Sequence, residues 1–135
     1  MHSRGEPKTM NSLTQYHDVL NEIWNELNEK INYAIENGLP RWNIIVDPGF
    51  GFSKENEANL IILKNMRFFK ESKFPLLVGY SNKRLVKNFF QNDLIVGNSI
   101  LGAVCVEKGA DMIRIHDYEV AKGIKFASKV YKENN

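Results

Sequence analysis

A carboxylate lies in a glycine-rich turn near the middle of the chain. Residues 43–46 form a short apolar, β-branched run of the kind found in strands that are buried on both faces, and Asp47 follows it directly. Pro48 and Gly49 end the run, because proline has no backbone donor and glycine accommodates a turn. An acid at the carboxyl end of a strand, within such a turn, is where α/β proteins place ligand contacts. The D-P-G stretch alone is equally compatible with a strand-to-helix turn that the acid caps.

Two further apolar runs also lead into polar residues. The runs are 74–79 and 112–115, and the polar residues at their ends are Ser81, Lys83, Arg84, Arg114 and His116. A carboxylate accepts hydrogen bonds from a planar pair of donors, whereas Lys83 and Arg114 are cations and His116 is a donor of a residue type that can carry a positive charge. These groups suit a small planar polar ligand that carries an anion, with Phe52 as an apolar wall. The spacing is also compatible with a solvated helix start at Lys83 and with an ordinary histidine beside a strand.

An alternation of helices with short strands would position these side chains. Apolar residues at helical spacing predict helices over 12–37, about 58–72, 84 to about 90, 98–108 and through 120–130. Short buried strands that alternate with helices predict a parallel sheet with helices outside it. All carboxyl ends of a parallel sheet face the same way. The residues expected to lie together at this carboxyl edge of the sheet are therefore Asp47, Ser81, Lys83, Arg114 and His116.

The composition limits the class of protein. A chain of 135 residues makes one modest domain, and a net charge of +2 with a sequence pI of about 8.6 lacks the basic footprint of a nucleic-acid binder. We find no apolar run of ~18 residues and no basic-then-apolar signal at the start, so no membrane partner is expected. Cys105 is the only cysteine, and the histidines lack the spacing of metal ligands. We expect a soluble cytoplasmic protein without a protein-built metal site.

Four blocks of the sequence, taken in order, resemble one enzyme family. They are M-H-S-R-G-E-P-K-T-M at 1–10, D-P-G-F-G-F at 47–52, G-Y-S-N-K-R at 79–84 and I-R-I-H-D at 113–117. At these spacings they closely resemble dihydropteroate synthase, the folate-pathway enzyme that sulfonamides target. The resemblance implies an α/β fold that is a partial (β/α)8 TIM barrel. Residues 1–135 would be roughly its last four βα units, the C-terminal half of a pterin-binding domain, with the N-terminal half absent.

The resemblance also implies an activity. The family condenses 6-hydroxymethyl-7,8-dihydropterin pyrophosphate with p-aminobenzoate and gives 7,8-dihydropteroate and pyrophosphate. We expect this reaction in the full-length context, with Mg²⁺ bound to the pyrophosphate and with a homodimeric protein, and we expect the chain alone to be inactive. The L-P-R-W segment at 39–42 is more similar to eukaryotic members, some of which carry the domain behind a pterin pyrophosphokinase. A plant-like bifunctional form would place the protein in mitochondria.

Roles for individual residues follow from the same resemblance. The residues that it implies for binding the pterin are Met1, Asp47, Gly79, Lys83 and Arg114. Those implied for p-aminobenzoate are Phe52, Ser81 and Arg84. Arg114 and His116 would bind the pyrophosphate. The catalytic residues would be Lys83, Arg114 and His116. No residue is implied as a metal ligand.

Two departures from the family pattern leave alternatives open. Asn82 replaces an arginine that usually precedes the lysine, which removes a cation and is expected to weaken the anchoring of its loop. A half-barrel would also leave apolar inner surface exposed, and the residues expected there are Ile44, Val46, Leu77, Val78 and Ile113. The alternatives are a non-catalytic module or remnant and a pterin-dependent methyltransferase domain. The S-N-K-R and R-I-H-D blocks argue against the methyltransferase, since methyl transfer releases no pyrophosphate.

Overall fold

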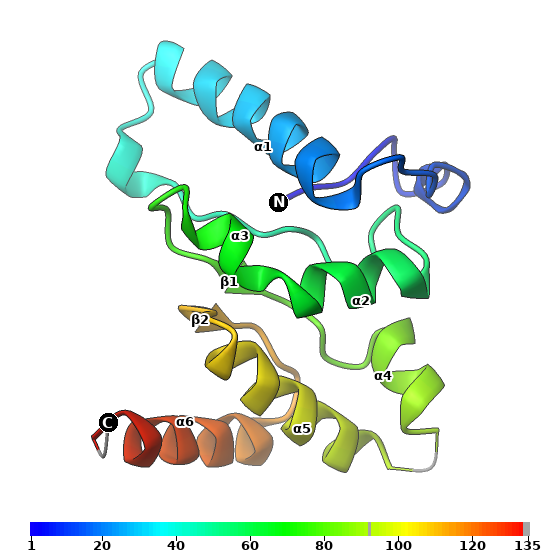
Figure 1. The fold of residues 1–135 in the computed structure, drawn as a ribbon, viewed down its shortest axis with the longest axis vertical. Coiled ribbons are helices and arrows are strands. Elements are labelled where there is room, and N and C mark those ends of the chain that lie inside the picture. Colours follow the sequence, from blue (N-terminus) through cyan, green and yellow to red (C-terminus); the bar gives the residue numbers. More distant parts are fainter. Residues whose placement is uncertain (92, 134–135) are drawn as a thin grey trace.

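Helices cover one side of a row of short parallel strands (Figure 1). The computed structural model describes residues 1–91 and 93–133, and the side chains as far as residue 130. The elements are η1 Met10–Ser12, α1 Val19–Glu36, η2 Arg41–Asn43, α2 Asn56–Lys64, α3 Met66–Lys70, β1 Leu77–Val78, α4 Arg84–Phe89, α5 Leu94–Glu107, β2 Met112–Ile113 and α6 Tyr118–Glu133. α1 packs against α2, and α5 packs against both α4 and α6. The predicted alternation of helices and parallel strands is confirmed.

The strands are shorter than predicted. β1 pairs with β2 in parallel, and the predicted strand 43–46 contributes a single bridge from Val46 to Leu76. The Val46 N–H donates to the carbonyl of Pro75, and the Leu77 N–H donates to the carbonyl of Val46. Pro75 has no N–H to donate to the carbonyl of residue 44, so the ladder stops there. The prediction of a strand over 43–46 is therefore wrong in extent, and residues 41–43 form η2 instead.

The two faces of this row differ in exposure. Ile44, Val46 and Val78 are buried against the helices, which contradicts the expectation that their side chains would be exposed. The register places Asp47, Leu77 and Met112 together on the other face, because side chains alternate along a strand. Leu77 is half-buried and Met112 is 42% exposed. The open apolar face is therefore real, but it is built from the residues that share a face with Asp47.

Local side-chain bonds explain where α1 differs from its prediction. α1 begins at Val19 rather than at residue 12, because the Asp18 carboxylate accepts the N–H of Asn21. Glu22 accepts the N–H groups of His17 and Asp18 and so completes the cap. The helix ends as predicted, since Gly38 has a φ of 91°, in the left-handed region that favours glycine after a helix.

Two other predicted helices also change their bounds. The helix predicted over 58–72 is divided into α2 and α3 at Asn65, whose side-chain amide donates to the carbonyl of Ile61. α5 starts four residues earlier than predicted, because the Asp93 carboxylate accepts the N–H of Val96. These changes leave the predicted order of elements intact. None of the helices among the described residues has the length and apolar character needed to cross a bilayer.

Candidate functional site

Three consecutive parallel segments end at one rim of the open face. Asp47 follows Val46, Gly79 follows β1 and Arg114 follows β2, and the pairing register places all three on the open face. A side chain on Gly79 would bring its Cβ to 2.8 Å from Nη2 of Arg114. Glycine at this position thus gives the Arg114 guanidinium room to lie over β1. The structure brings Asp47, Gly79 and Arg114 together as the sequence predicts.

The turn after Asp47 has one conformation that its own residues hold. Asp47 is 7% exposed, and its Oδ1 accepts the N–H of Gly49 at 2.7 Å. Gly49 and Gly51 both have a φ of 74°, where a side chain would be strained. A Cβ on Gly49 would also lie 2.0 Å from the carbonyl oxygen of His2. The carboxylate is thereby fixed in orientation, which suits a group that accepts hydrogen bonds from two donors of a ligand.

Lys83, the N-cap residue of α4, approaches this turn. Its Nζ donates to the carbonyl of Phe50 and lies 4.2 Å from the centre of the Phe52 ring. Burial lowers the pKa of Lys83 to about 8, an effect that Asp47 opposes and Arg114 adds to. The ammonium is therefore charged at neutral pH and lies within the electrostatic influence of both residues. A ligand carbonyl of suitable geometry could take the place of the Phe50 carbonyl.

Ser81 and His116 form a second pair at the same edge. Ser81 is buried, and its Oγ accepts the backbone N–H of His116 at 3.3 Å and lies 3.1 Å from His116 Nδ1. The His116 side chain is itself exposed. Ser81 thus orients the imidazole, a contact that the sequence did not predict. The predicted role of Ser81 toward p-aminobenzoate stays a prediction.

Met1 and Arg84 lie at the outer limits of this group. Arg84 forms an ion pair with Glu55, 3.0 Å between Nη1 and Oε2, and both side chains are about half exposed, so the pair contributes little to stability. Met1 is 50% exposed and lines a groove beside residues 43–46. The next residue, His2, donates its backbone N–H to the Asp47 carbonyl at 2.9 Å. Among the described residues, neither the Met1 nor the Arg84 side chain forms a hydrogen bond or an ion pair with Asp47.

Asn82 does not loosen its loop in the way that the sequence led us to expect. Its φ is 57°, in the left-handed region that asparagine enters more readily than most residues. The Asn82 backbone N–H donates to Asn98 Oδ1 at 3.1 Å, and Asn98 Nδ2 donates to Asn82 Oδ1 at 2.9 Å. Asn98 is buried in α5. This pair of bonds ties the Ser81–Lys83 loop to the helix, so the expected loss of anchoring is wrong.

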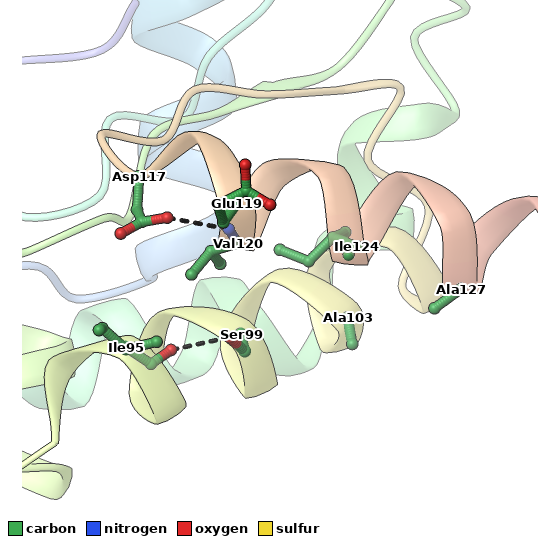
Figure 2. Close-up of a pocket in the computed structure, with 9 residues that line it drawn as sticks. Ile95, Ser99, Ala103, Asp117, Glu119, Val120, Ile124 and Ala127 are labelled. Atoms are coloured by element: carbon green, nitrogen blue, oxygen red, sulfur yellow. Dashed lines mark hydrogen bonds between the residues drawn. The ribbon is translucent and has the colours of Figure 1, made fainter.

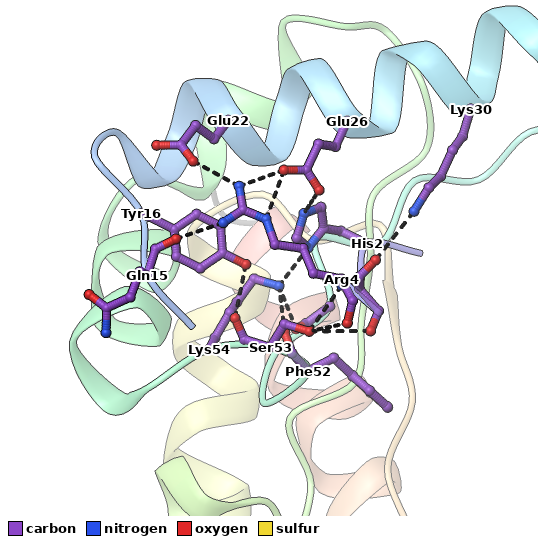
Figure 3. A network of polar contacts seen from close by, with 12 residues as sticks. His2, Arg4, Gln15, Tyr16, Glu22, Glu26, Lys30, Phe52, Ser53 and Lys54 are labelled. Atoms are coloured by element: carbon purple, nitrogen blue, oxygen red, sulfur yellow. Dashed lines mark hydrogen bonds and ion pairs between the residues drawn. The ribbon is translucent and has the colours of Figure 1, made fainter. Parts of the chain in front are cut away.

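Lys54 and His2 are the residues that sequence reasoning missed. Lys54 is 2% exposed, and His2 is fully buried beside it under α1 (Figure 3). Burial lowers the pKa of Lys54 to about 7, and burial together with the Lys54 charge lowers the pKa of His2 to about 4. The only signal was a lysine directly after the glycine-rich turn. Lysine is almost never fully buried, so that signal favoured a surface position.

The low pKa of His2 predicts a loss of stability in acid. The unfolded chain protonates His2 below about pH 6.5, whereas the folded chain resists protonation down to about pH 4. The unfolded state therefore binds more protons over this range, and the free energy of unfolding decreases as the pH is lowered. Urea titrations at pH 7 and pH 5 should show a loss of about 2 kcal/mol from this group. His2→Gln should remove that slope and His17→Gln should keep it. A slope that survives His2→Gln would contradict the assignment.

Comparison with known proteins gives one family. The model of the family described as pterin binding enzyme matches residues 1–116. The folic acid synthesis protein of Pneumocystis carinii is 38% identical, with 98% of this chain and 19% of that protein covered. The dihydropteroate synthase of Synechocystis is 33% identical, with 98% of this chain and 47% of the relative covered. The chain thus spans at most about half the length of these two curated relatives.

A solved structure gives the fold. The dihydropteroate synthase of Yersinia pestis, in a sulfonamide drug complex, superposes with a TM-score of 0.93 at 25% identity. The match covers 99% of this chain and 50% of the Yersinia chain. The prediction of a partial (β/α)8 barrel is confirmed by this agreement.

Proposed function

The chain belongs to the family of pterin-binding enzymes, and from this premise we propose that residues 1–135 supply the C-terminal half of a dihydropteroate synthase barrel. The complete barrel would join 6-hydroxymethyl-7,8-dihydropterin pyrophosphate to p-aminobenzoate in folate biosynthesis. The observation that carries the proposal is the convergence of Asp47, Lys83 and Arg114 at one rim of the open face. The curated relatives are named for dihydropteroate and folate synthesis, which favours this reaction over methyl transfer.

Asp47 and Lys83 would hold the pterin. One Asp47 oxygen is engaged by the Gly49 N–H, and that bond sets the plane in which the carboxylate accepts the ring N–H and the amino group of the pterin. Lys83 would donate to the carbonyl edge of the ring after releasing the carbonyl of Phe50. A carboxylate and an ammonium on opposite edges of a planar ring specify both its position and its orientation. Met1 and the backbone of Gly79 would border the same ring.

Arg114 and His116 would act on the leaving group. In the reaction the bond between the pterin methylene carbon and a pyrophosphate oxygen breaks, and the electron pair leaves with the pyrophosphate. The aniline nitrogen of p-aminobenzoate then bonds to that carbon and loses a proton. Fixed cationic and donor groups stabilise charge as it develops on the departing oxygen. The proximity of Arg114 to Gly79 and the contact of His116 with Ser81 support this role.

Phe52, Ser81 and Arg84 would receive the p-aminobenzoate. The Phe52 ring supplies an apolar surface beside Lys83. Arg84 would exchange the carboxylate of Glu55 for that of the substrate, and this exchange costs little because the present pair is solvent-exposed. The family's usual extra arginine is absent at Asn82, so Arg84 would carry more of the carboxylate recognition.

Mg²⁺ would bind to the pyrophosphate rather than to a protein site. The described residues contain no group of three or more histidine, cysteine or acidic side chains that could hold a metal ion. Asp47 already accepts a backbone N–H, and both Lys54 and Lys83 lie within its electrostatic influence. These residues do not fit a resident metal.

A homodimer of the full-length protein is supported by the surface of α5 and α6. An apolar groove of about 640 Å³ lies between these helices (Figure 2). Ile95 on α5 and Phe126 on α6 are 61% and 71% exposed, and these side chains are apolar surface that a second copy would cover. Location in the cytoplasm, or in mitochondria for a plant-like bifunctional form, stays a prediction.

The role of the Arg114 and His116 pair can be tested in a protein that carries the complete barrel. We expect Arg114→Ala to lower turnover about 100-fold or more, since removing one group that stabilises developing charge has this effect in other enzymes. His116→Ala should also lower turnover, and both variants should weaken inhibition by pyrophosphate. The KM for p-aminobenzoate should change much less. Steady-state kinetics with product inhibition measures all three quantities.

Arg67→Ala is the matched control, because Arg67 is a 76% exposed arginine on α3 whose one ion pair among the described residues is a long one, 3.9 Å, to Glu107. It should behave as the unaltered protein. Equal losses toward pyrophosphate and p-aminobenzoate in the Arg114 and His116 variants would instead indicate a distorted strand end and would contradict the assigned roles.

A further inference from the structure

Lys54 is a buried lysine whose ammonium form has an acceptor for each of its three hydrogens. Its Nζ donates to the Gly49 carbonyl at 3.1 Å and to the Phe52 carbonyl at 2.9 Å. The third contact is with His2 Nδ1 at 2.8 Å. A lysine ammonium has three donors and no acceptor, so this arrangement satisfies it completely. Two of the three acceptors belong to the turn that carries Asp47 and Phe52.

The contacts of His2 show how the third acceptor is kept available. Nδ1 must lack a proton to accept from Lys54, so the imidazole proton is on Nε2, 3.0 Å from Glu26 Oε2 on α1. Arg4 in turn binds Glu26 and Glu22, which holds the Glu26 carboxylate in place (Figure 3). Lys54 therefore connects the turn to α1 through a continuous chain of buried and half-buried polar groups.

Two lysines donate hydrogen bonds to carbonyls of the turn: Lys54, which follows the turn in the same segment, and Lys83, the N-cap residue of α4. Lys83 binds the Phe50 carbonyl, and Lys54 binds the carbonyls on either side of it. The function proposed above requires Lys83 to leave Phe50 and bind the pterin. Nothing in that function uses Lys54, which is buried and has no free donor. Once Lys83 has moved, Lys54 is the remaining lysine on the turn.

We propose that Lys54 is a positioning residue for pterin binding. It holds the carbonyls of Gly49 and Phe52 so that Asp47 and Phe52 keep their places when Lys83 exchanges the Phe50 carbonyl for the ligand. It acts through the turn and does not touch the ligand. The inference rests on the proposed function, because it concerns the same site.

The test is calorimetric titration of a protein that carries the complete barrel, with 6-hydroxymethyl-7,8-dihydropterin pyrophosphate as the probe. Lys54→Met keeps the length of the side chain and removes its three donors. We expect a 10-fold to 100-fold loss of pterin affinity. Among the kinetic constants the KM for the pterin should rise, while kcat and the KM for p-aminobenzoate change less than threefold. Lys64→Met, at an exposed lysine on α2, should leave all of these values unchanged.

His2→Gln provides a second and milder variant. The glutamine amide can replace Nε2 as the donor to Glu26, but the Nδ1 acceptor for Lys54 is lost. We expect a smaller loss of pterin affinity, about 3-fold to 10-fold, with p-aminobenzoate again unaffected. This variant decides the question where Lys54→Met does not fold.

The outcomes separate the two proposals. If the unaltered protein binds no pterin, the proposed function is wrong. Where it binds the pterin and a folded Lys54→Met variant binds equally well, the positioning role is wrong and the function stands. With an unfolded Lys54→Met variant, unchanged pterin affinity in His2→Gln overturns the positioning role. Equal losses toward both substrates would also overturn it, since a general structural defect would produce them.

Discussion

Asp47→Asn, in a protein that carries the complete barrel, is expected to lower the affinity for 6-hydroxymethyl-7,8-dihydropterin pyrophosphate by about 100-fold or more. The asparagine oxygen would keep the Gly49 N–H that Asp47 Oδ1 now accepts. The amide NH₂ would then stand where the second carboxylate oxygen accepts from the pterin. A donor would face a donor, and the charge-assisted bond would be lost, at a cost of about 3 kcal/mol.

Calorimetric titration with the pterin pyrophosphate measures this loss directly. Asp93→Asn is the matched control, because Asp93 caps α5 by accepting the Val96 N–H and asparagine is an equally good cap. The control should bind the pterin as the unaltered protein does. An Asp47→Asn variant that is folded and binds with unchanged affinity would remove Asp47 from the pterin site.

The rim residues could be predicted because their positions depend on strand direction alone. Asp47, Lys83 and Arg114 follow three short apolar runs, and in a parallel sheet every carboxyl end faces the same way. Helices alternating with those runs required the parallel arrangement. The exact hydrogen bonds within the runs did not affect this conclusion. The common position of these residues at one rim was therefore predicted even though the strand over 43–46 was reduced to one bridge.

Helix limits were less predictable because single polar side chains decide them. Periodicity shows that residues 58–72 have an apolar stripe, but the Asn65 side chain binds the Ile61 carbonyl and divides the helix. Asparagine makes such local bonds in competition with the helix. Whether it does so depends on the backbone around it. The composition of the stripe carries no information on this point.

Partners that come from distant parts of the chain could not be predicted at all. Lys54 is buried because His2, some fifty residues earlier, and the turn carbonyls supply three acceptors. Asn82 is anchored because Asn98 happens to lie opposite it in α5. In both cases the residue alone favours the opposite conclusion, a solvated lysine and a weakened loop. Only the tertiary fold shows that the polar groups are satisfied.

A polypeptide of residues 1–135 is expected to have no dihydropteroate synthase activity by itself. Arg114 and His116 are exposed, and Met112 and Ile45 on the open face are 42% and 44% exposed. A site that is open to water in this way cannot strengthen the electrostatic contacts that the leaving group requires. The chain covers 47% of the Synechocystis dihydropteroate synthase, and a (β/α)8 barrel typically takes about 250 residues.

Turnover of the purified polypeptide should therefore lie at the background rate. The assay must be sensitive enough to detect an activity about 10⁴-fold below that of the Synechocystis enzyme. Water exclusion and substrate positioning together contribute at least that factor to catalysis. Far-UV circular dichroism and the mass in solution, measured on the same sample, would show whether the polypeptide is folded and whether its copies associate. Turnover by a folded monomer would contradict the proposal, because it would mean that Asp47, Lys83, Arg114 and His116 suffice without the other half of the ring. Turnover confined to an associated form would mean that a second copy closes the open face, and the requirement for a complete site would stand.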